Sequence, residues 1–223
     1  MEEPTRSPLL LIVSSPSGAG KTTLTNKLRE SQEGVAFSVS HTTRKPRASE
    51  AHGREYYFVD RAAFLELVRK DAFLEWAEVH GNLYGTSRSE VERARGSRAL
   101  MFDVDYQGAR QIKCAVPDAV SVFILPPDMP TLEKRLRGRA SEDEATVQKR
   151  FRAATHEIAH YGAFDYVLVN DVLDRAIERL TSIFIAEECR RQRAAGRAEQ
   201  LLNQVRGYGG TTPPPVENAA PRS

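Results

Sequence analysis

A strand that runs into a glycine-rich turn and then a helix constrains this chain more than any other feature. Leu9–Val13 is an aliphatic run of strand length, and Ser-Ser-Pro-Ser-Gly-Ala-Gly-Lys-Thr-Thr follows it from residue 14 to residue 23. In this context the pattern is typical of a Walker A phosphate loop. The backbone N–H groups of such a turn surround phosphate oxygens, the helix adds its positive end, and Lys21 adds a full charge. The sequence therefore predicts a nucleotide-phosphate site.

The predicted loop departs from the usual pattern at one position. Position 15 is normally glycine and is serine here. If the backbone at this position needs a positive φ, the serine carries a steric cost. We assign these residues to ATP binding: Ser15, Pro16, Ser17, Gly18, Ala19, Gly20, Lys21, Thr22 and Thr23. The hydroxyl of Thr22 is the expected Mg²⁺ ligand.

Strand-length and helix-length segments alternate along the chain. The predicted strands are Leu9–Val13, Val35–Ser40, Ala99–Val104, Val120–Leu125 and Tyr166–Val169. The predicted helices are Thr22–Arg29, Arg61–Lys70, Ser87–Arg95, Met129–Leu136, Glu144–His160 and Leu173–Gln192. This alternation predicts an α/β domain with a largely parallel sheet.

Composition excludes several classes of protein. The 223 residues are enough for one domain with small inserted lobes. The formal net charge is only +2, so we expect neither a nucleic-acid partner nor a membrane partner. No apolar run approaches the roughly 20 residues that span a bilayer. Cys114 and Cys189 form no CxxC pair, so we predict reduced, buried or partly buried thiols and a cytoplasmic protein.

A second strand carries a candidate metal-binding carboxylate. Ala99–Asp103 ends in an acid, as a Walker B strand does when it contacts the hydration shell of Mg²⁺. We therefore predict that Thr22 and Asp103 bind the Mg²⁺ ion, in part through water molecules. Asp105 either points to the same side of the extended segment as Asp103 or caps the following turn or helix.

Four further segments decide the predicted substrate. They are Ser-Val-Ser-His-Thr-Thr-Arg-Lys-Pro-Arg-Ala-Ser-Glu over 38–50, Gly-Arg-Glu-Tyr-Tyr-Phe over 53–58, Phe-Leu-Glu-Trp over 73–76 and Gly-Asn-Leu-Tyr-Gly-Thr over 81–86. In this order, after a Gly-Ala-Gly-Lys-Thr loop, they closely resemble the guanylate kinase family, whose members transfer a phosphoryl group from ATP to GMP. The resemblance runs from about Leu9 to about Ala186.

The resemblance implies a GMP site. Arginines and tyrosines would hold the phosphate of GMP, because guanidinium forks match phosphate oxygens and phenols donate to the same anion. Glu75 would accept the N1–H and N2–H₂ donors of guanine, which adenine lacks as a pair. The implied GMP-binding residues are Ser40, Arg44, Arg47, Glu50, Tyr56, Glu75, Tyr84, Thr86, Asp103 and Asp105.

The resemblance also implies a lid and an adenine contact. Lid arginines would close over the triphosphate and neutralise charge on the transferred group. Asn170 matches a residue near the adenine of ATP. The implied catalytic residues are Lys21, Arg44, Arg135, Arg139 and Arg150, with Mg²⁺ and ATP as cofactor and phosphoryl donor.

The implied fold is that of a P-loop nucleoside monophosphate kinase. It has a parallel sheet flanked by helices, a small GMP-binding lobe and a helical lid. We expect an N-terminal extension at 1–8, a kinase domain at 9–203 and a disordered Gly- and Pro-rich tail at 204–223. Within the domain, the core comprises 9–39, 96–134 and 158–203, the lobe comprises 40–95, and the lid comprises 135–157.

Three alternatives stay open at this point. A non-catalytic guanylate-kinase-like module that binds a protein partner would have a damaged phosphate loop, and only Ser15 points that way. A kinase for another nucleoside monophosphate is opposed by Glu75. His156-Glu157-Ile-Ala-His160 matches the zinc-protease pattern HExxH, but the third ligand would have to be a downstream carboxylate such as Glu178 or Glu187. The sequence leaves the oligomeric state open.

Overall fold

The computed structural model describes residues 7–79, 81–138 and 144–207, with side chains described as far as residue 205. The chain forms two compact units, of which the first ends at Phe184 and the second begins at Ile185. The second unit contains α8 (Arg191–Gly207). The sequence predicts that the core of the domain ends at residue 203 and that a disordered tail begins at residue 204. In the structure α8 continues past this boundary to Gly207. Residues 208–223 lie outside the described residues, as do residues 1–6 of the expected N-terminal extension.

The first unit is built on a five-stranded parallel sheet with the order β2-β7-β1-β8-β9. The strands are β1 (Leu9–Ser14), β2 (Val35–Phe37), β7 (Ala99–Asp103), β8 (Val120–Leu125) and β9 (Tyr166–Val169). All of β1 is buried, which explains its unbroken aliphatic sequence. The predicted parallel sheet is confirmed.

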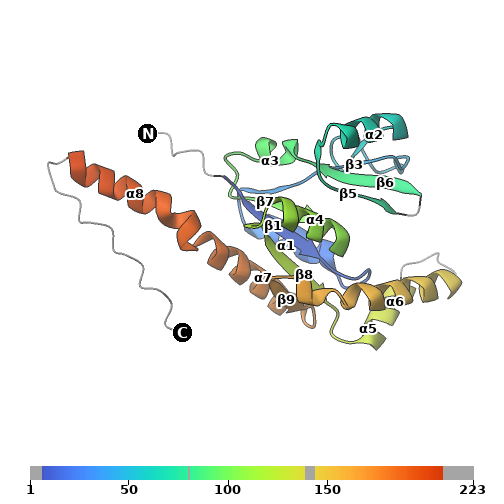
Figure 1. Ribbon diagram of the computed structural model, residues 1–223. Coiled ribbons are helices and arrows are strands. Elements are labelled where there is room, and N and C mark those ends of the chain that lie inside the picture. Colours follow the sequence, from blue (N-terminus) through green and yellow to red (C-terminus); the bar gives the residue numbers. More distant parts are fainter. Residues whose placement is uncertain (1–6, 80, 139–143, 208–223) are drawn as a thin grey trace. The chain divides into compact units, whose positions relative to one another are not determined.

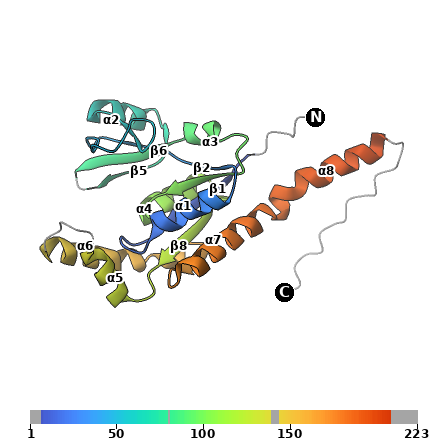
Figure 2. The same ribbon diagram turned by 180° about the vertical axis from the view of Figure 1, so that it is seen from behind.

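Helices cover both faces of this sheet (Figures 1 and 2). On one face, α1 (Lys21–Ser31) and the first part of α7 (Leu173–Glu188) pack on Leu9, Leu11 and Val13. On the other face, α4 (Tyr106–Ala115) packs on Leu10 and Ile12. The list of predicted helices does not include α4, which begins where Asp105 accepts a hydrogen bond from the Gly108 N–H at 2.8 Å, the cap of a following turn or helix that the sequence left open.

A second sheet with the order β4-β3-β6-β5 forms the lobe. The strands of this sheet are β3 (Ser40–Thr42), β4 (Tyr56–Phe58), β5 (Phe73–Val79) and β6 (Asn82–Ser87). The lobe also contains the helices α2 (Arg61–Arg69) and α3 (Ser89–Arg93). The lobe has its own core of Phe64, Phe73 and Leu83. The single strand predicted at Val35–Ser40 is wrong, because the chain leaves the first sheet after Phe37 and joins the second at Ser40.

The segment predicted as the lid begins with the last turn of one helix and continues into another. These are α5 (Met129–Arg137) and α6 (Glu144–Ile158), and the short helix η1 (Tyr161–Ala163) follows them. Leu132 and Leu136 of α5 pack against Val147 and Ala154 of α6. The predicted catalytic residue Arg139 lies outside the described residues.

Three smaller outcomes complete the comparison with the sequence. The helix predicted to reach Gln192 ends at Glu188, and α8 begins separately at Arg191. Both cysteines are free and exposed, so their predicted burial is wrong. Among the described residues, no helix combines the length and the apolar character that crossing a membrane requires.

Candidate active site

The phosphate loop connects the end of β1 to the start of α1, as predicted. Gly18 and Gly20 adopt φ values of 91° and 95°, which side-chain-bearing residues rarely adopt. Among the described residues, Asp71 is the only non-glycine with a positive φ. Ser15 therefore occupies the position of the usual glycine without the steric cost that the sequence raised.

Two side chains donate hydrogen bonds to the main chain of the phosphate loop. The Nδ2 of Asn170 donates to the carbonyl oxygen of Ala19 at 2.7 Å, and the Nη1 of Arg135 donates to the same oxygen at 3.2 Å. Asn170 is only 6% exposed. A Cβ added at Gly20 would collide with the Nδ2 of Asn170. The loop thus needs glycine at position 20 for its conformation and for this close contact.

Lys21, Thr22 and Asp103 lie at the carboxyl end of the parallel sheet. Lys21 forms an ion pair with Asp103, and its Nζ donates to the Val104 carbonyl oxygen at 3.2 Å. Asp103 ends β7 directly opposite Val13 in the parallel register. Thr22 is exposed in the first turn of α1. Lys21 of the predicted Walker A loop and Asp103 of the predicted Walker B strand are therefore in contact.

Two residues of α6 contact the phosphate loop at Ser17. The Nη2 of Arg150 donates to the Oγ of Ser17 at 2.6 Å. The Oε2 of Glu157 accepts the backbone N–H of Ser17 at 3.1 Å. The structure therefore places the predicted lid residue Arg150 against the loop.

A basic and aromatic cluster in the lobe contains the residues assigned to the GMP phosphate. The Nη2 of Arg44 pairs with the Oε1 of Glu50 at 2.8 Å, and the Oε2 of Glu50 accepts the Arg47 N–H at 2.8 Å. The Arg44 guanidinium lies 5.4 Å from the ring centroid of Tyr56, whose ring is 6.0 Å from that of Tyr84. Burial raises the pKa of Tyr56 above its usual value, which further favours the neutral phenol. The side chain of Arg47 is exposed.

Three strands of the lobe bring together the residues assigned to guanine. The Oγ1 of Thr86 donates to the Oε1 of Glu75 at 2.7 Å and lies 2.9 Å from the Oγ of Ser40. Glu75 is only 6% exposed, and burial, assisted by the charge of Asp105, raises its pKa to about 7. No cation is paired with Glu75 among the described residues. Asp105 itself caps α4, the second of the two roles that the sequence left open.

Comparison with known proteins decides the family. The model of the guanylate kinase family matches residues 7–187. A guanylate kinase of Myxococcus xanthus is 47% identical over 187 residues, which is 83% of this chain and 90% of the relative. A guanylate kinase of Anaeromyxobacter dehalogenans is 50% identical over 192 residues, which is 85% of this chain and 84% of the relative.

A solved structure agrees with these relatives. The crystal structure of guanylate kinase from Anaplasma phagocytophilum is 34% identical, with a TM-score of 0.70 over 90% of this chain and 97% of that one. The chain belongs to the guanylate kinase family. The predicted P-loop nucleoside monophosphate kinase fold and the predicted guanylate kinase activity are confirmed. The non-catalytic module finds no support.

The guanylate kinase chain also contains a contact that the sequence analysis missed. The Oε1 of Gln111 accepts the backbone N–H of Trp76 at 3.1 Å, and its Nε2 donates to the Trp76 carbonyl oxygen at 3.0 Å. This pair of bonds joins α4 to β5 next to Glu75. A lone glutamine in a helix has no sequence signal, because the contact arises only when α4 packs beside β5.

The HExxH alternative is wrong for this guanylate kinase. Among the described residues, no three His, Cys, Asp or Glu side chains lie close enough together to hold a metal ion. His160 instead stacks on Tyr106, with ring centroids 3.9 Å apart and planes within 5°, and Glu157 is bonded to Ser17. The pattern comes from a helix that packs against two neighbouring elements.

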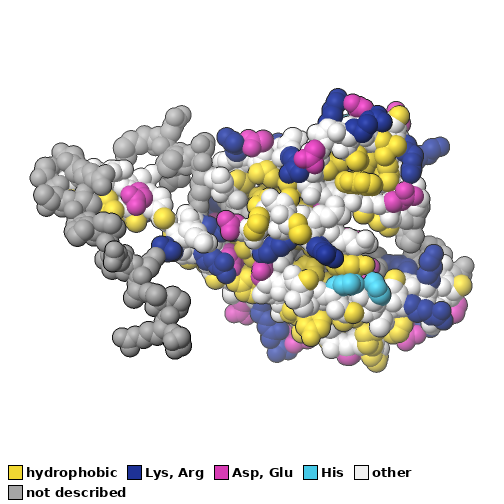
Figure 3. All heavy atoms as spheres, in the orientation of Figure 1, with side chains coloured by type: hydrophobic (Ala, Val, Ile, Leu, Met, Phe, Trp, Pro, Cys, Tyr) yellow, Lys and Arg dark blue, Asp and Glu magenta, His cyan; other side chains and the backbone are white. Residues whose placement is uncertain are grey.

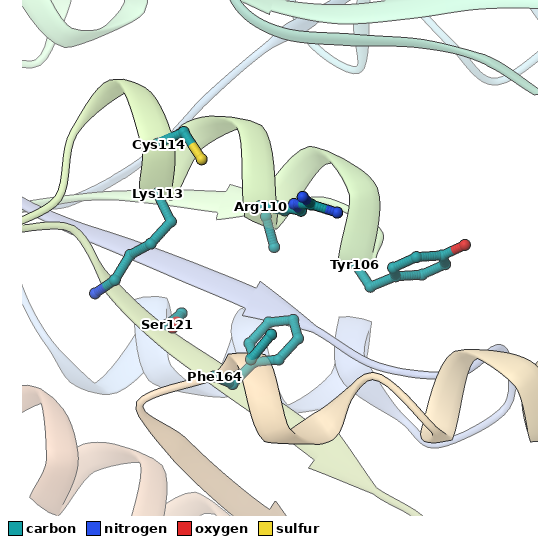
Figure 4. A pocket seen from close by; sticks show the side chains of 8 residues that line it. Tyr106, Arg110, Lys113, Cys114, Ser121 and Phe164 are labelled. Atoms are coloured by element: carbon teal, nitrogen blue, oxygen red, sulfur yellow. The ribbon is translucent and has the colours of Figure 1, made fainter.

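A small cavity of about 140 Å³ lies outside the phosphate loop of the guanylate kinase (Figure 4). The side chains around it include those of Tyr106, Arg110, Lys113, Cys114 and Phe164. None of the residues assigned to ATP or GMP lines it. The residues that the sequence assigns to the substrates therefore lie in other parts of the chain than the lining of this cavity.

Proposed function

We propose that this guanylate kinase transfers the γ-phosphoryl group of ATP directly to the phosphate of GMP, with the residues of the loop, the lobe and the lid in the roles described below. The observation that carries this assignment is the buried carboxylate of Glu75, which Thr86 and Ser40 hold in a hydrogen-bonded chain within electrostatic reach of Asp105. A buried acceptor without a paired cation suits a neutral group with adjacent N–H donors. The edge of guanine that carries N1–H and N2–H₂ is such a group.

Backbone donors and Lys21 bind the phosphates of the donor nucleotide. The loop between Ser15 and Gly20 supplies N–H groups, and α1 supplies its positive end. Lys21 exchanges Asp103 for phosphate oxygens when ATP binds. We assign Asn170 a second role, the support of the loop at Ala19, beside the adenine contact implied by the resemblance.

The residues beside the loop fit a Mg²⁺ ion that arrives with ATP. Mg²⁺ prefers oxygen ligands and keeps several waters, with substrate phosphates among its ligands. Thr22 supplies an exposed hydroxyl and Asp103 a carboxylate that is one-third exposed, which is enough to hold such an ion partly through water. When bound, the ion draws charge from the phosphate oxygens.

The lobe binds and orients GMP. Arg44, Arg47, Tyr56 and Tyr84 hold its phosphate, with Glu50 fixing the two arginines. Glu75 in its ionised form accepts the two guanine donors, while Ser40 and Thr86 hold the carboxylate and address the acceptor side of the base. Adenine offers no such donor pair and leaves a buried acceptor unsatisfied, which costs about 1–3 kcal/mol or more for a charged group.

The transfer itself needs no nucleophilic side chain. A phosphate oxygen of GMP attacks in line, and the chain contributes position and charge. Arg150 donates a hydrogen bond to the side chain of Ser17 in the loop, and Arg135 donates one to the carbonyl oxygen of Ala19. We assign both to the charge that develops on the transferred group and to the exclusion of water.

The partners of this reaction are ATP and GMP. We infer a cytoplasmic location, which its two unpaired, exposed thiols support.

The experiment that tests the proposal is an acceptor panel. ADP formation from ATP and Mg²⁺ is measured with GMP, AMP, UMP and CMP, and with no acceptor. We expect turnover with GMP and little with the other three. Equal turnover with AMP would contradict the role of Glu75, and equal ADP formation without any acceptor would contradict the transfer.

A further inference from the structure

Two residues of α6 hold Ser17 from two sides. Arg150 and Glu157 are seven positions apart, which places them on one face of the helix, two turns from each other. Arg150 donates to the Ser17 side chain at 2.6 Å, and Glu157 accepts the Ser17 backbone N–H at 3.1 Å. One residue of the phosphate loop is therefore bonded to α6 through both its side chain and its main chain.

The bond to Glu157 puts a protein anion in a loop built for anions. The N–H groups of a phosphate loop are donors for phosphate oxygens. In this structure a carboxylate oxygen of Glu157 takes one of them. Glu157 is half-buried, and the titratable groups around it are Lys21 of α1, Asp105 before α4 and His156 of α6. A triphosphate that reaches the loop therefore meets a carboxylate already in contact with it.

Aromatic packing lies next to the turn of α6 that carries Glu157. The ring of His160 stacks on Tyr106 at 3.9 Å, and the ring of His156 lies 6.0 Å from the same tyrosine. Figure 3 shows histidine side chains together on this face of the molecule, over α6. These ring contacts join the end of α6 and the residues just after it to α4, next to the turn that carries Glu157.

We propose that Glu157 is a positioning residue that occupies the phosphate loop in place of a phosphate oxygen, and that the triphosphate of ATP displaces it from Ser17. This inference rests on the proposed function, in which the loop binds the triphosphate. Displacement breaks one of the two bonds between Ser17 and α6. Nucleotide binding is thereby coupled to the helix that carries Arg150.

The test compares Glu157→Gln with the unaltered full chain. Glutamine keeps the size of the side chain and an oxygen acceptor but removes the negative charge. Because the charge opposes the triphosphate, we expect the dissociation constant for ATP with Mg²⁺, measured by titration calorimetry without GMP, to fall about 5- to 10-fold. The KM for ATP should fall with it, while kcat stays within about 2-fold because the residue does not touch the reacting atoms.

Two controls make the result specific. Glu178→Gln removes the same charge from an exposed position on α7 and should leave the dissociation constant for ATP unchanged. The dissociation constant for GMP should not change in either variant. Glu157→Ala removes the acceptor as well and should also bind ATP more tightly, and the glutamine variant decides the question by itself if the alanine variant does not fold.

The opposite results overturn the proposal. Weaker ATP binding in Glu157→Gln would make Glu157 a support that the loop needs while ATP is bound, and unchanged binding would mean that its charge does not oppose the nucleotide. GMP-dependent ADP formation by the unaltered chain is measured first. Failure of that measurement rejects the proposed function, whereas failure of the calorimetric comparison rejects only the displacement of Glu157.

Discussion

The phosphate loop and the GMP lobe are proposed to bind the same chemical group by different means. The loop uses backbone N–H groups of consecutive residues, shaped by the positive φ values of Gly18 and Gly20. The lobe uses side chains that are far apart in the sequence: Arg44 and Arg47 between β3 and β4, Tyr56 in β4 and Tyr84 in β6. A backbone site is a local property of the chain, whereas a side-chain site depends on how strands pair.

The two regions are alike in one pairing of charges, and the lobe adds a buried charge of its own. Lys21 in the loop is paired with Asp103, and Arg44 in the lobe is paired with Glu50, so each of these two proposed phosphate-binding cations has a carboxylate partner. Glu75 has the opposite arrangement, because it is a buried carboxylate held only by neutral donors. Substitutions in the loop should therefore change turnover, and substitutions around Glu75 should change selectivity.

The largest effect is expected for Lys21→Ala. Loss of the ammonium removes charge stabilisation of the transferred group, and turnover should fall by about 10³-fold or more. The lobe does not depend on this side chain, so the dissociation constant for GMP should stay within about 2-fold. A parallel loss of GMP binding, measured by calorimetry, would show that the two regions are not separable in this way.

Glu75→Gln should have the next largest effect and should act on selectivity. Glutamine offers one oxygen and one N–H₂ group where guanine needs two acceptors, so kcat/KM for GMP should fall by about 100-fold. The KM for ATP should not change. Steady-state kinetics measures the ratio of kcat/KM for GMP to kcat/KM for AMP. If this ratio is unchanged in the variant, Glu75 does not recognise guanine.

The raised pKa of Glu75 makes the lobe pH-sensitive. Burial raises this pKa from 4.5 to about 7, so the folded protein binds the proton more tightly than the unfolded chain does. The contribution of Glu75 to stability is therefore fully present below about pH 4.5 and is lost as the pH rises through 7. At pH 8 this contribution to the free energy of unfolding is about 3 kcal/mol smaller than it is below pH 4.5.

Urea unfolding at pH 5 and pH 8 measures this contribution. The free energy of unfolding of the unaltered chain should fall relative to that of Glu75→Gln as the pH rises. Parallel changes in the two proteins would contradict the buried position of the ionised group. GMP binding should weaken below pH 7, because guanine needs the ionised carboxylate and competes with its proton.

The smallest effect is expected for Ser15→Gly, which restores the usual residue of the loop. Ser15 has no positive φ, so glycine relieves no strain. The KM for ATP and kcat should stay within about 2-fold, and stability should fall by about 0.5 kcal/mol because glycine is more flexible in the unfolded chain. A large gain in activity would show that Ser15 strains the loop during turnover.

Much of the first sheet and the whole phosphate loop could be predicted from the sequence. The strands β8 and β9 have the predicted ends, and β1 and β7 differ from prediction by one residue. The HExxH pattern does not mark a metal site here, because α6 ends at Ile158 and both histidines pack on Tyr106. The predicted burial of Cys114 and Cys189 is also wrong, since burial depends on which parts of the chain pack over a residue.

The sequence by itself determined the features that consecutive residues produce. A strand, a glycine turn and a lysine at a helix start form a phosphate site because backbone geometry is local. The tertiary structure alone decided which distant groups meet: Gln111 with Trp76, Glu157 with Ser17, and Thr86 with both Ser40 and Glu75. These contacts depend on strand register and helix packing over long separations, and the raised pKa of Glu75 exists only because that packing removes water from around the carboxylate.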